Sequence, residues 1–187
     1  MGEEFKRMQK LAGIITEDKQ TYDYGCVMIY FDFPTINKIH DSISPDDIYT
    51  EDGDGSFGIE DEPHTTLLYG LHKEVDTDTI KNILGDYEFD TCTISNASLF
   101  ENEKFDVLKF DVSGVNLKEA NNDLTIQPHT TDYPNFHPHL TIAYLKPGTG
   151  KKYTKILEGE KFELKPQYVI YSKPDGGKDK INIKVKN

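Results

Sequence analysis

The sequence predicts an α+β domain made of two similar halves. A seven-residue stretch, PHTTLLY at 63–69, recurs in the same register as PHLTIAY at 138–144. The elements expected around these copies follow the order strand, helix, motif strand, helix, hairpin, helix, motif strand, which fits an α+β domain with internal duplication. With 187 residues, the chain is expected to form a single domain of two lobes over 1–187, with enough buried surface to fold without disulfides.

Apolar spacing predicts the elements of the N-terminal half. Residues 3–17 carry apolar side chains three or four positions apart, which predicts an amphipathic helix within an N-terminal helical extension, residues 1–21. A long strand is expected over 25–33, a helix over 34–43, the first motif strand up to residue 71, and a helix over 76–84. Asp76 or Thr77 is the expected cap of that helix, because short polar side chains accept hydrogen bonds from its first free amides.

Turn residues divide the C-terminal half in the same way. Strands over 88–100 and 105–113, joined by a charged turn, predict a hairpin, and a short helix is expected over 116–124. Beyond the second motif strand, a lysine-rich segment over 146–155 leads into a helix that ends near residue 157. Strands over 161–172 and 180–186 are expected to pair across the PDGG turn at 174–177.

Both copies of the motif read as strands that place a histidine and a threonine on one face. Because side chains alternate along a strand, His64 and Thr66 project together, with their Cα atoms roughly 7 Å apart. The same alternation holds for His139 and Thr141. A lone His-x-Thr has little significance, but the repeat in register favours a functional pair. If the two strands meet, the site holds two imidazoles and two hydroxyls.

This set of side chains suits phosphoryl chemistry. A neutral imidazole can accept a proton from an attacking oxygen, and a protonated one can donate a proton to the leaving oxygen, since a pKa near 6.5 populates both forms near neutrality. The hydroxyls would hold the non-bridging oxygens of the phosphate. The near-symmetry of the motifs leaves open which histidine is the base and which the acid.

The paired motifs, HTTL at 64–67 and HLTI at 139–142, resemble those of the 2H phosphoesterase superfamily. This superfamily includes RNA 2′,3′-cyclic phosphodiesterases and the proteins called 2′-5′ RNA ligases. Three further stretches resemble phage anti-CBASS nucleases, which degrade cyclic di- and trinucleotide second messengers: YGCVMIYFD at 24–32, EDEPH with LLYGLH across 60–72, and FHPH at 136–139. The resemblance covers most of the chain from about Tyr22 onward.

The resemblance implies a bilobal fold, in which two antiparallel sheets with helices, related by an internal pseudo-two-fold, flank a central cleft. The side chains of the two motifs would point into this cleft. The implied activity is cleavage of a 3′-5′ phosphodiester bond in a small cyclic oligonucleotide, without a metal or any other cofactor. An N-terminal segment helps to cover the ligand in the anti-CBASS family, so Tyr22 or Tyr24 is expected to stack on a nucleobase. The nucleophile, water or a ribose 2′-hydroxyl, stays open.

Two other functions are compatible with the same residues. One is an enzyme that opens RNA 2′,3′-cyclic phosphates, and the other is a protein that sequesters a nucleotide without turnover. The formal charge of −12 and the pI near 4.9 favour a compact oligonucleotide over a long nucleic acid, because proteins that grip long strands usually present a basic surface. Acidity that serves solubility alone is the competing interpretation. The oligomeric state is not indicated.

Three histidines near the second motif, His129, His137 and His139, resemble a metal cluster, but no carboxylate or cysteine accompanies them at ligand spacing, so no metal site is expected. His137 would share the face of His139 and either line the site or orient it. Lys146 follows the second motif closely, so it is a candidate phosphate contact, although a solvated face is the commoner role. The acidic loop at 51–57 departs from the calcium-loop pattern and is expected to be solvated.

Cys26 and Cys92 fall within expected strands and are interpreted as buried, reduced thiols. No apolar run approaches the roughly 20 residues that span a bilayer. A cytoplasmic protein without membrane contact is therefore expected, in the host cell if the gene belongs to a phage.

Overall fold

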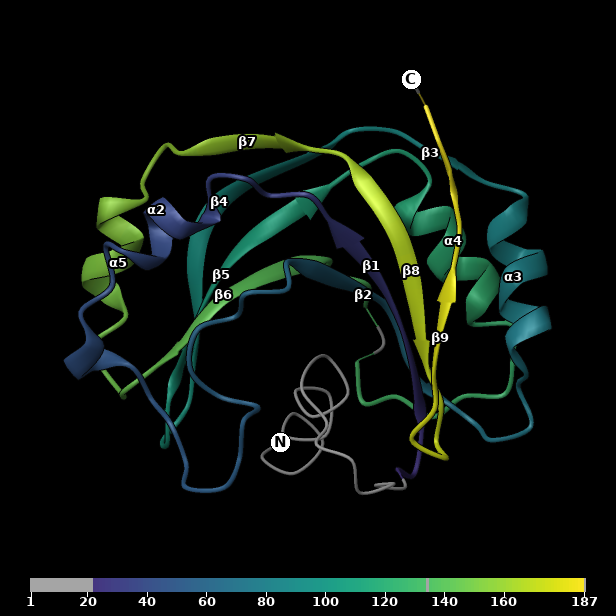
Figure 1. Cartoon of the computed structure of the whole chain (residues 1–187), viewed down its shortest axis with the longest axis horizontal. Helices are drawn as coiled ribbons and strands as arrows, with labels where there is room; N and C mark the ends of the chain where they lie inside the picture. Colours follow the sequence, from purple (N-terminus) through teal and green to yellow (C-terminus); the bar gives the residue numbers. More distant parts are fainter. Residues whose placement is uncertain (1–21, 134, 187) are drawn as a thin grey trace.

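The computed structural model describes residues 22–133 and 135–186, so the predicted helix over 3–17 and the extension over 1–21 lie outside the described residues. Two four-stranded antiparallel sheets form the body of the protein (Figure 1). The first sheet has the order β2 (His64–Leu71), β1 (Gly25–Phe31), β8 (Pro166–Ser172), β9 (Lys178–Ile181). The second has the order β6 (His139–Leu145), β5 (Asp106–Ser113), β4 (Cys92–Glu101), β7 (Lys161–Leu164). The predicted α+β class is confirmed, whereas the two-fold relation between lobes stays a prediction.

Short helices flank the two sheets. α3 (Thr77–Gly85) and α4 (Leu117–Leu124) lie beside the first sheet, and α2 (Ile36–His40) and α5 (Lys151–Ile156) lie beside the second (Figure 1). The predicted cap of α3 is confirmed, since the Asp76 carboxylate accepts a hydrogen bond from the Thr79 amide at 2.7 Å. One hydrophobic cluster includes buried side chains of both sheets and of these helices. A 3₁₀ turn, η1 (Pro45–Asp47), follows α2.

Three of the predicted strands are interrupted. The expected strand over 180–186 breaks at residues 182 and 183, between β9 and β10 (Lys184–Val185). The expected strand over 88–100 breaks at Asp90 and Thr91: β3 (Glu88–Phe89) pairs in parallel with β10, and only β4 forms the hairpin with β5. The expected strand over 161–172 divides at Lys165, because Pro166 has no amide hydrogen to continue the ladder. β7 therefore pairs with β4 in the second sheet, while β8 pairs with β1 and with β9 in the first.

Each motif strand also binds, through its backbone, the segment that leads into the other motif. Tyr144 of β6 exchanges backbone hydrogen bonds with Tyr49 and Gly58, so the acidic loop that precedes the first motif is anchored at both ends. On β2, the His72 amide donates to the Pro128 carbonyl, and the Thr130 amide donates to the Gly70 carbonyl at 2.9 Å. The approach to each motif is thus fixed by the opposite motif strand.

Candidate active site

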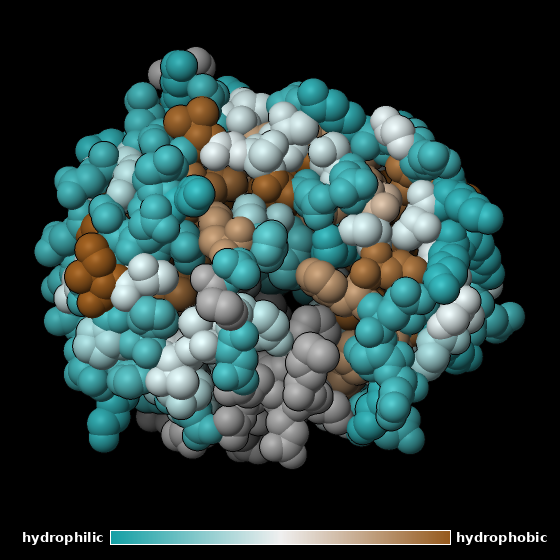
Figure 2. Space-filling view, turned by 180° about the vertical axis from the view of Figure 1, so that it is seen from behind, coloured by the Kyte–Doolittle hydropathy of each residue, from teal (hydrophilic) through white to brown (hydrophobic). Residues whose placement is uncertain are grey.

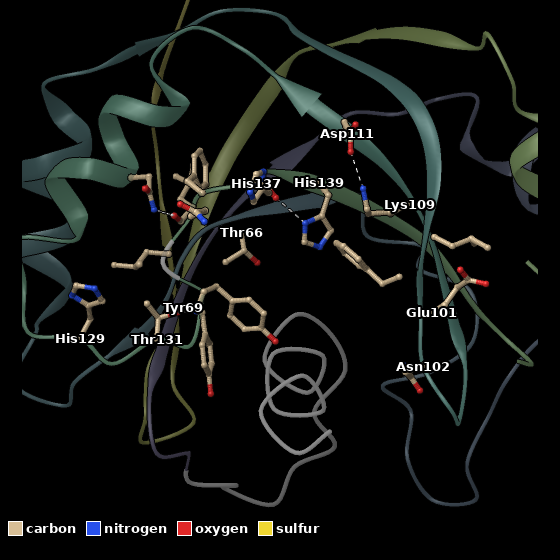
Figure 3. Close-up of a pocket in the computed structure, with 18 of the residues that line it drawn as sticks. Thr66, Tyr69, Glu101, Asn102, Lys109, Asp111, His129, Thr131, His137 and His139 are labelled. Atoms are coloured by element: carbon tan, nitrogen blue, oxygen red, sulfur yellow. Dashed lines mark hydrogen bonds and ion pairs between the residues drawn. The ribbon is translucent and has the colours of Figure 1, made fainter. Parts of the chain in front are cut away.

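The motif strands β2 and β6 are the edges of the two sheets, and they contact each other at the middle of the molecule (Figure 1). Leu140 and Ile142 are fully buried in the core, whereas His139 and Thr141 are only partly buried, as the alternation predicts. Figure 3 shows Thr66 and His139 pointing into the same space between the sheets. The structure therefore brings the two halves of the repeat together.

Each motif strand carries a β-bulge at the same position. The ladder between β1 and β2 skips Leu67, and the ladder between β5 and β6 skips Ile142, in both cases the third residue after the histidine. A bulge shifts the alternation by one residue, so the tyrosine five positions after each histidine lies outside the main core. Tyr69 accordingly packs with Met28 and Tyr30, and Tyr144 packs in a separate aromatic cluster.

The two motif histidines are held in the same tautomer. The His64 Nδ1 lies 2.7 Å from the Glu62 carbonyl, and the His139 Nδ1 lies 3.0 Å from the His137 carbonyl, two residues earlier in each case. A carbonyl oxygen only accepts hydrogen bonds, so each Nδ1 carries a hydrogen. The Nε2 of each ring is left as the atom that can take or give a proton during a reaction.

His64 lies in an aromatic environment. Its ring stacks on Tyr30 with 5.1 Å between centroids, Tyr30 stacks on Tyr168 at 5.2 Å, and the Lys180 ammonium lies 3.8 Å from the Tyr168 centroid. These four side chains form a row across the four strands of the first sheet. Burial lowers the pKa of His64, opposed in part by its hydrogen bond to the Glu62 carbonyl and by the Glu62 charge.

His139 lies beside an ion pair instead. In the register of β5 with β6, Asp111 is opposite His139 and Lys109 is opposite Thr141. The Lys109 ammonium is 2.7 Å from the Asp111 carboxylate, and the Phe100 ring meets the His139 ring edge-on at 5.0 Å. Burial, aided by the charges of Lys109 and His64, lowers the pKa of His139 to about 4. The charge effect of His64 indicates that the two imidazoles lie within electrostatic range of each other.

A cavity of about 1460 Å³ opens beside these residues. Thr66 and Tyr69 of β2, Lys109 and Asp111 of β5, and His139 of β6 line it, together with the β4–β5 hairpin and the 129–137 segment (Figure 3). Seen from behind, the surface is hollowed at its centre, and hydrophobic side chains gather around the hollow (Figure 2). This volume exceeds the roughly 300–1,000 Å³ usual for small-molecule pockets, and most of the exposed lining is apolar.

The four predicted catalytic residues differ in whether they line the cavity. Thr66 and His139 are among the described lining residues, whereas His64 and Thr141 are not. His64 is only 8% exposed, because its ring is packed against Tyr30. His137 lines the cavity and its carbonyl also orients His139, so both roles considered for it are present.

The other predicted substrate contacts lie away from the cavity lining. Tyr24 stacks on His72 and packs edge-on against Tyr69, which does line the cavity. Tyr22 packs against the same aromatic cluster, and its amide donates to the Pro174 carbonyl. Lys146 donates from its ammonium to the Asp46 carbonyl at 2.6 Å, so in this structure it anchors the turn before the acidic loop.

Sequence reasoning missed Lys109, Asp111 and Phe100. The signal for the first two was present, because both are charged residues within a largely apolar strand, FDVLKFDV at 105–112, whose third charged residue is Asp106. Phe100 gave no such signal, since an aromatic residue near the end of a strand is common.

Among the described residues, no group of three or more His, Cys, Asp or Glu side chains is arranged to hold a metal ion. Cys26 and Cys92 are buried free thiols, as predicted. Within the same part of the chain, no helix has the length and apolar character needed to cross a membrane.

The chain is similar to known proteins in structure rather than in sequence. No family model matches the chain, and no curated protein matches it. A solved crystal structure of a phosphoesterase is similar over 85% of this chain and 95% of its own length, with a TM-score of 0.45 and 15% sequence identity. Because the similarity is this low, the chemistry of the site is inferred below from the residues of the chain itself.

Proposed function

We propose that this protein is a phosphodiesterase that cleaves a 3′-5′ bond of a small cyclic oligonucleotide without a metal cofactor. The observation that carries this proposal is the pair of motif histidines, each with its Nδ1 hydrogen bonded to the carbonyl two residues earlier and its Nε2 left for proton transfer. A phosphodiester cleavage requires one base and one acid on opposite sides of the phosphorus, and two such histidines supply both.

In the proposed reaction, the neutral imidazole takes the proton from the attacking hydroxyl through its Nε2. The oxygen then forms a bond to phosphorus, and the bond from phosphorus to the leaving oxygen breaks. The imidazolium donates its Nε2 proton to that oxygen, which leaves as an alcohol. The Thr66 and Thr141 hydroxyls donate hydrogen bonds to the non-bridging oxygens, and proton exchange with water restores both rings.

Because both histidines have a lowered pKa, we infer that substrate binding helps to protonate one of them. Burial keeps His64 and His139 neutral in the free protein near pH 7. A bound phosphodiester brings a negative charge between the rings, which favours protonation of one of them. The acid form is therefore completed by substrate binding.

The shape and charge of the site favour a compact substrate. The cavity is larger than most small-molecule pockets, and Phe100 and Tyr133, which line it, are 37% and 40% exposed. Aromatic faces of this kind stack on nucleobases of any identity. Among the exposed residues that line the cavity, the carboxylates of Glu101 and Glu103 outnumber the Lys104 ammonium, which disfavours a long polyanion.

The structure also supports the two-fold relation that the resemblance implies. In each sheet the motif strand is an edge strand and pairs with a strand that precedes it in the chain, β1 or β5, and the bulges fall at equivalent positions. In a cell, the proposed cleavage would remove cyclic-nucleotide immune signals from the cytoplasm, which is the role expected from the resemblance to anti-CBASS nucleases.

The test is incubation of the purified protein, in EDTA, with 3′,3′-cyclic di- and trinucleotides and with an RNA that ends in a 2′,3′-cyclic phosphate, followed by chromatography and mass spectrometry. We expect linear products from a cyclic oligonucleotide, and their ends identify the nucleophile. His64→Ala and His139→Ala should abolish turnover, whereas His40→Gln, a histidine of α2 outside the cavity lining, should not.

Each other outcome changes the assignment. Opening of only the RNA end would make the protein an RNA 2′,3′-cyclic phosphodiesterase that uses the same residues. Binding without turnover of any substrate would indicate sequestration and refute the proposed enzyme.

A further inference from the structure

The two halves of the site differ in one respect that bears on mechanism. On the first sheet, the residues opposite His64 and Thr66 are Tyr30 and Met28, neither of which carries a charge near neutrality. On the second sheet, the corresponding positions opposite His139 and Thr141 are Asp111 and Lys109. The repeat is therefore similar in its histidines and threonines but electrically asymmetric in the strands beside them.

Lys109 is held rigidly at this position. Lys109 is 7% exposed. Its ammonium lies 2.7 Å from the Asp111 carboxylate and 4.8 Å from the centroid of the Phe100 ring. The Asn96 amide donates to the second Asp111 oxygen at 2.5 Å, which fixes the carboxylate in turn. Burial of a lysine costs desolvation free energy even when the ammonium is paired. Because Lys109 also lines the cavity, this cost suggests that its charge serves to bind a ligand there.

An anion in the cavity is the natural partner of this ammonium. Lys109, Asp111 and His139 line the same cavity (Figure 3), and Lys109 is the residue opposite Thr141 in the strand register. An ammonium has three donors, of which the Asp111 carboxylate oxygen at 2.7 Å takes one. A phosphate oxygen placed between the Lys109 ammonium and the Thr141 hydroxyl would receive hydrogen bonds from both.

We propose that Lys109 is a catalytic residue that binds a non-bridging oxygen of the scissile phosphate, and that its charge assigns the base to His139 and the acid to His64. This inference rests on the proposed function and deepens it. The groups that face His139 are Lys109 and Asp111 from β5 and His64 from β2; those that act on His64 are Glu62 and Lys178. The Lys109 ammonium disfavours a charged His139 more than the Asp111 carboxylate favours it. The Glu62 carboxylate, in contrast, favours a charged His64 more than Lys178 opposes it.

The assigned step follows from this arrangement. His139 Nε2 takes the proton of the attacking hydroxyl, the new oxygen–phosphorus bond forms, and the bond to the leaving oxygen breaks. The His64 imidazolium gives its Nε2 proton to the leaving oxygen. Lys109 transfers no proton in this step; its ammonium donates hydrogen bonds to the equatorial oxygens and stabilises the charge that concentrates there in the transition state.

The first experiment measures binding of inorganic phosphate by NMR, with the histidine ring signals as reporters, in the wild type and three variants. Lys109→Met removes the cation, Lys109→Arg keeps it, and Lys155→Met removes an exposed lysine of α5 as the matched control. We expect Lys109→Met to weaken phosphate binding about tenfold or more, since hydrogen bonds to charged groups are the stronger kind. It should also move the His139 titration to higher pH, while Lys155→Met changes neither quantity.

A double variant keeps the test valid if Lys109→Met folds poorly. Lys109→Met combined with Asp111→Asn removes both charges of the pair and leaves an amide for Asn96, so no unpaired carboxylate stays buried. Phosphate binding as tight as in the wild type, together with an unchanged His139 titration, would show that Lys109 is only structural and would overturn the proposal.

Kinetics then test the assignment of base and acid. A p-nitrophenyl ester of a nucleotide has a leaving group that departs without a proton, so it does not need the acid. We expect His64→Ala to retain much more of its activity on this ester than on a cyclic dinucleotide, and His139→Ala to lose activity on both. The reverse pattern would overturn the assignment. If the wild type cleaves neither substrate, the proposed function fails, whereas the phosphate and titration measurements still judge Lys109.

Discussion

Replacement of His139 by glutamine should change how the stability of the protein depends on pH. In the folded protein, burial and the nearby Lys109 ammonium lower the pKa of His139 to about 4. In the unfolded chain a histidine titrates near 6.5. Between these values the unfolded chain binds the proton and the folded protein does not, so this contribution to stability is complete above pH 6.5 and is lost as the pH falls towards 4.

The size of the effect follows from the two pKa values. Between pH 7.5 and pH 4.5, the wild type should lose up to about 2.5 kcal/mol from this residue, an upper value because the ring keeps some contact with water. Glu60 acts in the opposite direction, because burial raises its pKa to about 7, so the folded protein gains a proton over much of the same range. The two effects nearly cancel in the wild type, and only a comparison with the variant separates them.

The assay is urea unfolding of the wild type and of His139→Gln at both pH values, followed by far-UV circular dichroism because the chain has no tryptophan. Titration of Glu60 occurs in both proteins and drops out of the difference. We expect the variant to gain about 2 kcal/mol relative to the wild type as the pH falls from 7.5 to 4.5. A difference that stays constant within about 0.5 kcal/mol would refute the idea that His139 is held neutral.

Other predictions test the frame of the site and its chemistry. Gly70→Ala should lower the free energy of unfolding in urea by at least about 2 kcal/mol, because Gly70 has a φ of +107° and an added Cβ would lie 1.9 Å from the Thr130 carbonyl oxygen. Gly85→Ala is the control and should be tolerated, because its added Cβ would meet nothing within 4 Å. Equal effects of the two substitutions would contradict this packing. Phe100→Ala should raise KM about fivefold or more through lost base stacking, while Ile156→Ala, an exposed residue of α5, leaves KM unchanged; equal KM values would exclude Phe100 as a base platform. Turnover should continue in excess EDTA, and loss of activity that zinc or calcium restores would show that a metal is required.

The sequence predicted the parts of the fold that depend on local patterns. Alternation predicted that Leu140 and Ile142 are in the core, and the short polar Asp76 predicted the start of α3. The repeated motif predicted that the strands β2 and β6 meet. These features are set within a few residues of the chain, which is why pattern and spacing were sufficient.

The features that were missed depend on partners far away in the sequence. Nothing near Lys165 indicates that β7 and β8 belong to different sheets, because that division is decided by pairing with β4 and β1. The bulges at Leu67 and Ile142 are visible only against the neighbouring strands. Likewise, the place of Lys109 beside His139 follows from the register of β5 with β6, which no local pattern determines.

The passage of the C-terminal segment from one sheet to the other also bears on how the chain acquires its structure. β1 is one of the two inner strands of the first sheet and β4 one of the two of the second, and each obtains its second neighbour only when residues 161–172 are in place. Pairing of β1 with β8 joins residues that are far apart in sequence, which makes such a contact slow to form. During synthesis, β1 and β4 would each lack one neighbour until residues 161–172 have left the ribosome, so both sheets depend on the same segment. A chain shortened before residue 161 would leave β1 and β4 as exposed edge strands, which favours aggregation.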